Sequence, residues 1–157
     1  MQSVFLRQDF TSRDFSHERM KNGIFRECSF DRALISDAHF ISCTFENCTF
    51  LDCEMRYSVL ASSVMKGCSF TGSSLLISNF RGSEITDSDF SACQIFFSDF
   101  TNCRIRNTLF EDCLLKRTDF RKSDLTAISF RYSDPDEAFF DGDGRWLPSI
   151  PSSSHSE

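Results

Sequence analysis

The sequence predicts an all-β repeat protein, and two regularities with a period of five residues lead to this conclusion. Every residue from Phe5 to Phe130 whose number is a multiple of five is Phe, Ile, Leu or Met. Two positions before each of these, from Gly23 to Ser123, stands a small residue. A helix would repeat apolar residues every three or four positions and a flat strand every two, so neither explains the pattern. A fixed internal period is typical of repeat architectures.

We call the apolar residue of each five the centre, and the small residue two positions earlier the small position. Residues two apart in extended backbone point to the same side, so both face one narrow interior. All eight Cys occupy the small position, where a compact thiol packs well. From Phe70 to Phe130 the centres alternate between Phe and an aliphatic residue, and all but three of the nineteen Phe are centres.

The residue before the centre is often Asp, as in Asp89 before Phe90 and Asp119 before Phe120. Such segments resemble the repeat unit of the pentapeptide-repeat family, Ala-(Asp/Asn)-Leu-x-x, and the resemblance covers about residues 5 to 130. It implies a right-handed quadrilateral β-helix, with one pentad per side and four pentads per coil. The repeat length then predicts about six coils, stacked about 4.8 Å apart. On four sides, the alternating centres place Phe on two opposite sides.

The two ends depart from the repeat. We expect the solenoid to cover residues 1–133, with 1–20 as an imperfect first coil because Gln8, Arg13 and Glu18 occupy its small positions. Residues 134–148 are expected to form a C-terminal cap with a short helix, since Asp134, Pro135 and Glu137 have the spacing of a helix start. Trp146 would help to cover the last coil. Residues 149–157 are predicted to be a disordered tail.

The sequence offers no catalytic or metal-binding set. The spacing among the Cys is that of the repeat, not that of a zinc site, and no nucleophile with a base is indicated. We therefore expect no enzyme and no cofactor. No apolar run is long enough to span a membrane, and no signal peptide is evident, so we expect a cytoplasmic protein without membrane contact. The net charge of -6 argues against direct nucleic-acid binding.

Outward positions twenty residues apart should form columns on the surface. One group of neighbouring columns is apolar and contains Tyr57, Leu76, Ile77, Phe96, Phe97 and Leu114. Adjacent exposed apolar side chains mark interaction sites, so we expect a homodimer contact or a site for a protein partner here. Another side is acidic and contains Asp31, Asp52, Asp89, Glu111 and Asp112. The side opposite to it is basic on balance and contains Arg19, Lys21, Arg81, Arg121 and Lys122 against Asp99 and Asp119.

These surfaces predict a non-enzymatic scaffold that presents charged and apolar faces to a protein. The alternative is DNA mimicry, because the quinolone-resistance members of the family resemble a DNA duplex and act on DNA gyrase. This resemblance implies binding to gyrase or topoisomerase and protection from quinolone-type inhibitors. Against it, the repeat from residue 21 to 130 is nearly neutral and no loop interrupts it. A secreted effector is a third hypothesis, disfavoured because the register begins at Phe5.

Overall fold

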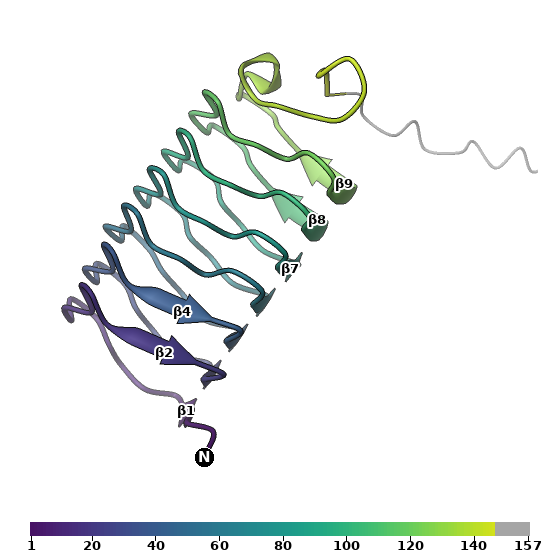
Figure 1. The fold of residues 1–157 in the computed structure, drawn as a ribbon. Coiled ribbons are helices and arrows are strands. Elements are labelled where there is room, and N and C mark those ends of the chain that lie inside the picture. The colour runs from purple at the N-terminus through teal and green to yellow at the C-terminus, as the bar shows by residue number, and fades with distance from the viewer. Residues whose placement is uncertain (147–157) are drawn as a thin grey trace, which may run out of the picture.

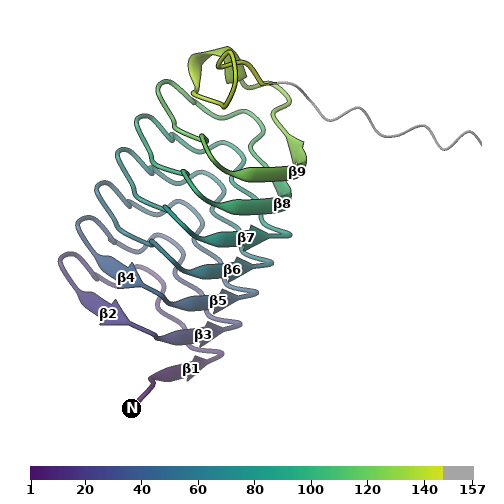
Figure 2. The same ribbon diagram turned by 45° about the vertical axis from the view of Figure 1, so that its right-hand side comes forward.

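The chain folds as a right-handed, four-sided parallel β-solenoid of about six turns (Figures 1 and 2). This computed structural model describes residues 1–146. Each residue pairs with the residue twenty positions later, as Phe5 does with Phe25 and Phe25 with Phe45. The all-β fold and the four-pentad coil predicted from the sequence are confirmed.

The regular elements are short because each side of a coil is only one pentad long. A seven-stranded parallel sheet has the order β1-β3-β5-β6-β7-β8-β9, and β2 pairs with β4 on another side. The strands are β1 (Val4–Leu6), β2 (Arg19–Lys21), β3 (Ile24–Arg26), β4 (His39–Ile41), β5 (Thr44–Glu46), β6 (Val64–Lys66), β7 (Glu84–Thr86), β8 (Arg104–Leu109) and β9 (Asp124–Ser129). The one helix in the described part is η1, a 3-10 turn at Pro135–Glu137. Elsewhere the coils are joined by isolated parallel bridges.

We name the four sides A to D by their inward-facing centres. Side A, which carries the long sheet, is centred on Phe5, Phe25, Phe45, Met65, Ile85, Ile105 and Leu125. Side B is centred on Phe10, Phe30, Phe50, Phe70, Phe90, Phe110 and Phe130. Side C is centred on Phe15, Ile35, Met55, Leu75, Ile95 and Leu115. Side D is centred on Met20, Phe40, Leu60, Phe80, Phe100, Phe120 and Phe140.

From Phe70 to Phe140 the core is built from two columns of Phe rings on sides B and D. Within a column the rings stack, with centroids 4.5 Å apart for Phe70 and Phe90 and 4.6 Å apart for Phe80 and Phe100. Across the core the columns meet edge to face, at 86° between Phe90 and Phe100. The aliphatic centres of sides A and C fill the remaining space. Burying each centre contributes roughly 1.5–3 kcal/mol before the loss of chain entropy.

The small position is a hydrogen-bonding position as well as a steric one. Its side chain donates to the carbonyl of the centre 23 residues earlier, as Ser78 Oγ does to Met55 O at 2.7 Å. The Cys93 thiol makes the same bond to Phe70 O at 3.0 Å. Both carbonyls also accept from a backbone N–H three residues on, Ser58 N for Met55 O and Ser73 N for Phe70 O, so the side chain supplies a second donor to a carbonyl that has no water to bind. This explains why Ser, Thr and Cys fill the position so often.

The corners of the coil explain two further preferences of the repeat, for Asp before the centre and for Asp or Asn two positions after it. An Asp before the centre accepts from the backbone N–H two positions on, as Asp89 does from Ser91 N at 2.8 Å. The residue two positions after the centre has a positive φ in pentad after pentad, as at Asp87 (53°) and Asn102 (55°). Asp and Asn tolerate this left-handed conformation better than most residues.

At the N-terminal end, a large residue in the small position covers the open coil. The guanidinium of Arg13 lies 5.5 Å from the ring centre of Phe10 and 4.9 Å from that of Phe15. Both rings are buried, at 8% and 9% exposure.

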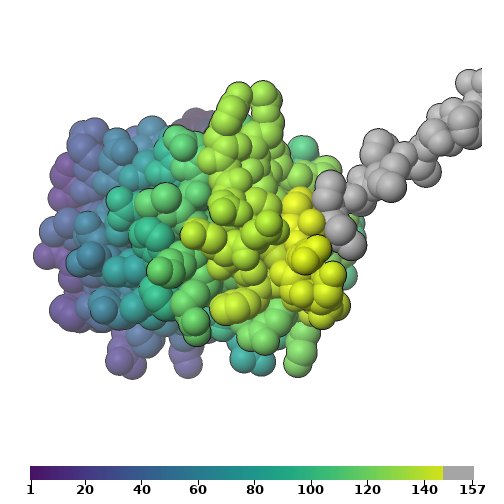
Figure 3. All heavy atoms as spheres, turned by 90° about the horizontal axis from the view of Figure 1, so that it is seen from above, coloured from purple at the N-terminus to yellow at the C-terminus, as the bar shows by residue number. Residues whose placement is uncertain are grey.

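At the C-terminal end, the coil pairing extends beyond Ser133. After the single turn of η1 the chain returns to the register, so that Phe139 bridges Asp119 and the ring of Phe140 stacks on Phe120 at 5.3 Å. The ring centre of Trp146 lies 4.9 Å from that of Phe130 and thereby covers part of the last coil. Figure 3 looks down on this end. The predicted tail, 149–157, lies outside the described residues.

Candidate interaction surface

The six apolar residues singled out in the sequence all lie on the outside of side C. Tyr57, Ile77 and Phe97 form one column at the corner toward side D, with exposed fractions of 50%, 43% and 49%. Leu76 and Phe96 form the adjacent column and are half-buried. Leu114 is exposed on the column before the centre. The structure therefore places these side chains on one continuous surface, which we call the side C surface.

The corner column of this surface has an unfavourable backbone conformation. The φ angles of Tyr57, Ile77 and Phe97 are 58°, 55° and 58°, in the left-handed region. A β-branched residue such as Ile is a genuine outlier there. Asn, Asp or Gly would suit the backbone better and would be better solvated, so neither packing nor backbone preference accounts for these large apolar side chains.

Two further residues belong to the surface and were not predicted. The guanidinium of Arg117 lies 5.8 Å from the ring centre of Phe97 and 5.6 Å from that of Phe139. These contacts join the corner column to Phe139 on side D. A signal for this was present in the sequence, because Phe96, Phe97 and Phe139 are the three Phe that are not centres.

The acidic residues share side B, but most of them are engaged within the solenoid. Asp31 accepts from Leu51 N at 3.0 Å, Asp89 caps its own corner, and Glu111 accepts from the hydroxyl of Ser129 at 2.5 Å. These three residues are half-buried. Asp52 and Asp112 are exposed. The negative surface on this side is consequently narrower than the sequence indicates.

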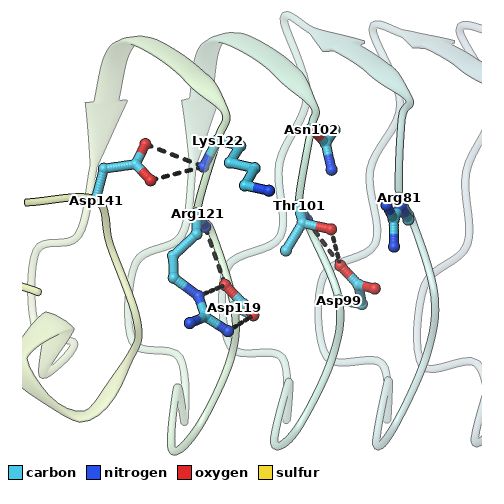
Figure 4. Close-up of a pocket in the computed structure, with 8 residues that line it drawn as sticks. All are labelled: Arg81, Asp99, Thr101, Asn102, Asp119, Arg121, Lys122 and Asp141. Carbon is cyan, nitrogen blue, oxygen red and sulfur yellow. Dashed lines mark hydrogen bonds and ion pairs between the residues drawn. The ribbon is translucent and has the colours of Figure 1, made fainter.

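Side D holds a shallow hollow of ≈ 360 Å³ that is lined by charges of both signs (Figure 4). Arg121 and Asp119 form an ion pair at 2.6 Å, and the hydrogen bond from Arg121 lowers the pKa of Asp119. The backbone N–H of Lys122 donates to both carboxylate oxygens of Asp141, at 2.9 and 3.0 Å. Three basic and three acidic side chains line the hollow, so its net charge does not favour an anion or a cation.

The eight Cys are free thiols, and all are buried. Burial raises the pKa of Cys53, Cys103 and Cys113 to about 12 each, which opposes thiolate formation at neutral pH. Among residues 1–146, no group of three His, Cys, Asp or Glu is placed to hold a metal ion. None of the helices in this part is long and apolar enough to cross a membrane.

Comparisons with known proteins agree with the geometry of the coils. A family model for a pentapeptide repeat region matches residues 63–140, and one for eight copies of the pentapeptide repeat matches residues 33–72. A search of curated proteins found no match.

Solved structures of repeat proteins are similar to this one. A trypsin-treated form of QnrB1, a plasmid-mediated fluoroquinolone resistance protein, is 18% identical, with a TM-score of 0.57 over 88% of this chain and 78% of that chain. HetL from the cyanobacterium Nostoc, a pentapeptide repeat protein involved in heterocyst differentiation regulation, is 10% identical, with a TM-score of 0.34 over 94% of this chain and 91% of that chain. The repeat, its coil geometry and the family models lead to one conclusion: the chain belongs to the pentapeptide-repeat family.

Proposed function

We propose that this protein is a non-enzymatic scaffold in the cytoplasm that binds a protein through the side C surface. The observation that carries the proposal is the position of the off-register aromatic residues. Phe96, Phe97 and Phe139 lie near one corner of the solenoid, with Arg117 between two of the rings. Most other corners carry a polar or charged residue or Gly at the equivalent position, with Ala92, Ala127 and Tyr132 as the exceptions.

The composition of this surface suits a binding site. Tyr and Arg are among the residues enriched at the centres of interfaces, where a few side chains supply most of the binding energy. Leu76 and Phe96 are half-buried beside the column and would exclude water from it. The backbone beneath is held by hydrogen bonds between coils, such as Ile77 N to Phe96 O at 2.9 Å. A preorganised surface of this kind loses little conformational freedom on binding.

The test is co-purification with paired variants of the tagged protein. Phe97→Asp places a charge at the middle of the surface, whereas Ala92→Asp places the same charge at the equivalent corner of side B. Both positions have a φ of 58°, where Asp is tolerated. We expect a protein that is retained by wild type and by Ala92→Asp but lost with Phe97→Asp. Equal recovery with all three would contradict the proposal.

DNA mimicry toward gyrase or topoisomerase is the second candidate. The observations that favour it are the exposed carboxylates of Asp52 and Asp112 on side B and the fold shared with QnrB1, a fluoroquinolone resistance protein. The test is gyrase supercoiling with and without a fluoroquinolone, across a range of protein concentrations. Inhibition or drug protection that is lost in Asp52→Asn/Asp112→Asn would support this candidate. No effect on gyrase or on topoisomerase would exclude DNA mimicry toward these enzymes.

A further inference from the structure

The side C surface also indicates what binds to it. Resting on the proposed function, we propose that its occupant is a second copy of this chain. The two solenoids pack side C against side C in antiparallel orientation, about a two-fold axis at the level of Ile77.

The argument begins with the even spacing of the coils. On side C, Leu34 bridges Glu54, Glu54 bridges Ser74, and the series continues to Leu114. Successive levels are therefore twenty residues and about 4.8 Å apart. A two-fold axis that lies across the side maps each column onto itself with its direction reversed. With the axis at Ile77, a residue one coil below faces a residue one coil above on the second copy.

The apolar residues match in this arrangement. Ile77 faces Ile77 of the second copy, and Tyr57 faces Phe97 of the second copy. On the column before the centre, Leu34 faces Leu114 of the second copy, and these two are 45% and 49% exposed. The two-fold axis that pairs the aromatic residues therefore also pairs two exposed Leu residues on a different column. These Leu residues were not used to choose the axis.

The charges match as well. Asp37, which is exposed and makes no ion pair within residues 1–146, faces Arg117 of the second copy. Arg56 faces Phe96 of the second copy, which allows a cation–π contact. Symmetry makes each of these pairs twice.

A buried polar atom lies on the same surface. Glu54 Oε1 is buried without a hydrogen-bond partner in the described part of the chain, although Arg56 Nε lies 3.4 Å from it. In the proposed dimer Glu54 faces Gln94 of the second copy, whose side chain is exposed. An amide donor opposite this carboxylate is a complementary contact.

Other two-fold arrangements of the two solenoids do not pair these residues in a complementary way. Moving the axis by half a coil toward the C-terminus would set Asp37 against Glu137 and Arg56 against Lys116. Like charges that face each other across an interface oppose association. Parallel packing about an axis along the solenoid would reverse the order of the columns, so the corner column with Ile77 and Phe97 would face the column with Ser74 and Gln94 and not itself.

The proposed axis leaves one like-charge pair on the described part of side C. Asp14 faces Asp134 of the second copy, at the outer rim, where solvent screens the repulsion. From Leu34 to Leu114 the surface is about 20 Å tall. It is therefore at the small end of specific interfaces, and we expect a dissociation constant of about micromolar.

Sedimentation velocity from about 1 to 200 µM tests the proposal. We expect a concentration-dependent dimer for wild type and for Ala92→Asp, and a monomer for Ile77→Asp, which sets two carboxylates against each other at the axis. Asp suits the backbone at position 77, so the variant should fold, as circular dichroism would verify. A dimer unaffected by Ile77→Asp would overturn the proposal.

A charge exchange tests the register. Asp37→Arg alone and Arg117→Asp alone should each weaken the dimer by about tenfold. The double variant Asp37→Arg/Arg117→Asp should recover most of the affinity, although it lacks the Arg117 contacts with Phe97 and Phe139. If the double variant loses as much binding free energy as the two single variants together, the antiparallel register is overturned.

The outcomes separate this proposal from the proposed function. A wild type that remains a monomer at about 200 µM overturns self-association. If such a monomer retains another protein in a Phe97-dependent way, the scaffold function stands with a different occupant. If it retains none, both proposals fail.

Discussion

The guanidinium of Arg117 lies 5.8 Å from the ring centre of Phe97, the residue twenty positions earlier in the same corner column. It lies 5.6 Å from the ring centre of Phe139 as well. The contact joins three successive coils on the outside of the solenoid, whereas the Phe columns join them on the inside. It also fixes the position of a cation within an apolar surface.

Removal of this side chain should have a small effect on stability. We expect Arg117→Ala to lower the free energy of unfolding by about 0.5–1 kcal/mol, since cation–π contacts at exposed sites have this magnitude. Urea denaturation would measure it. The control is Lys116→Ala, one residue away, for which no aromatic contact is found in the described part of the chain. Equal losses for the two variants would contradict a specific contact of Arg117.

Because the backbone at Ile77 is left-handed, replacing this residue by Asn should stabilise the monomer and weaken the dimer. Ile77→Asn should raise the free energy of unfolding of the monomer by about 1 kcal/mol, because a β-branched residue is strained at a φ of 55° and Asn is not. The measurement is urea denaturation at a concentration below the dimer range. Ala92→Asn, at the same kind of corner, should gain less. A loss of stability in Ile77→Asn would show that Ile77 makes stabilising contacts within the monomer.

Removing the hydrogen bonds of one small-position side chain should reduce stability more than removing Arg117, although fewer atoms are removed. Ser98 Oγ donates to Leu75 O at 2.5 Å and accepts from Ser78 N at 3.2 Å. Ser98→Ala removes both of these bonds and leaves Ser78 N and Leu75 O with only their mutual bond of 3.1 Å, so it should reduce stability by about 1–1.5 kcal/mol. Ser91→Ala, at an outward position, should change it by less than about 0.5 kcal/mol. If both variants unfold at the same urea concentration, the small position is steric only.

The buried thiols predict a pH dependence. The pKa values of Cys53, Cys103 and Cys113 are each about 12 in the folded chain, against about 8.5 for a free thiol. Between these values the unfolded chain loses protons that the folded chain retains, so the free energy of unfolding falls as pH rises. Below about pH 8.5 this contribution is fully present.

Urea denaturation between about pH 8 and pH 10 would measure this slope. Replacement of the three Cys by Ser, a residue that occupies equivalent small positions, removes three of the titrating thiols and should reduce the slope. Part of the slope should remain, because the pKa values of Cys28, Cys43, Cys48 and Cys93 are raised as well. An unchanged slope in the triple variant would show that other groups cause the pH dependence.

The features that repeat were predictable from the sequence. The centres, the small position and the alternation of Phe follow from a period of five and predict the sides and the core correctly. The return of Phe139 and Phe140 to the register was not predicted, because Pro135 occupies a centre. Only the structure shows that one 3-10 turn returns the chain to its column.

The contacts between coils could not be predicted from the sequence either. The bond from Ser78 to Met55 spans 23 residues, an offset that depends on how the corner is turned. The outward position of Asp31 indicated an exposed charge, but its acceptance of Leu51 N depends on the side-chain rotamer. The role of Arg117 depends on Phe97 and Phe139, which lie next to it in space but 20 and 22 residues away in sequence.

Site-specific photo-cross-linking from position 97 tests the central claim, protein binding through the side C surface, most directly. A benzophenone amino acid replaces Phe97 in one protein and Ala92 in the control, and both are irradiated in cells. We predict a cross-linked protein from position 97 and none from position 92. A product of twice the chain mass would identify the second copy, and any other mass a different partner. No product from position 97, or the same products from both positions, would contradict the claim.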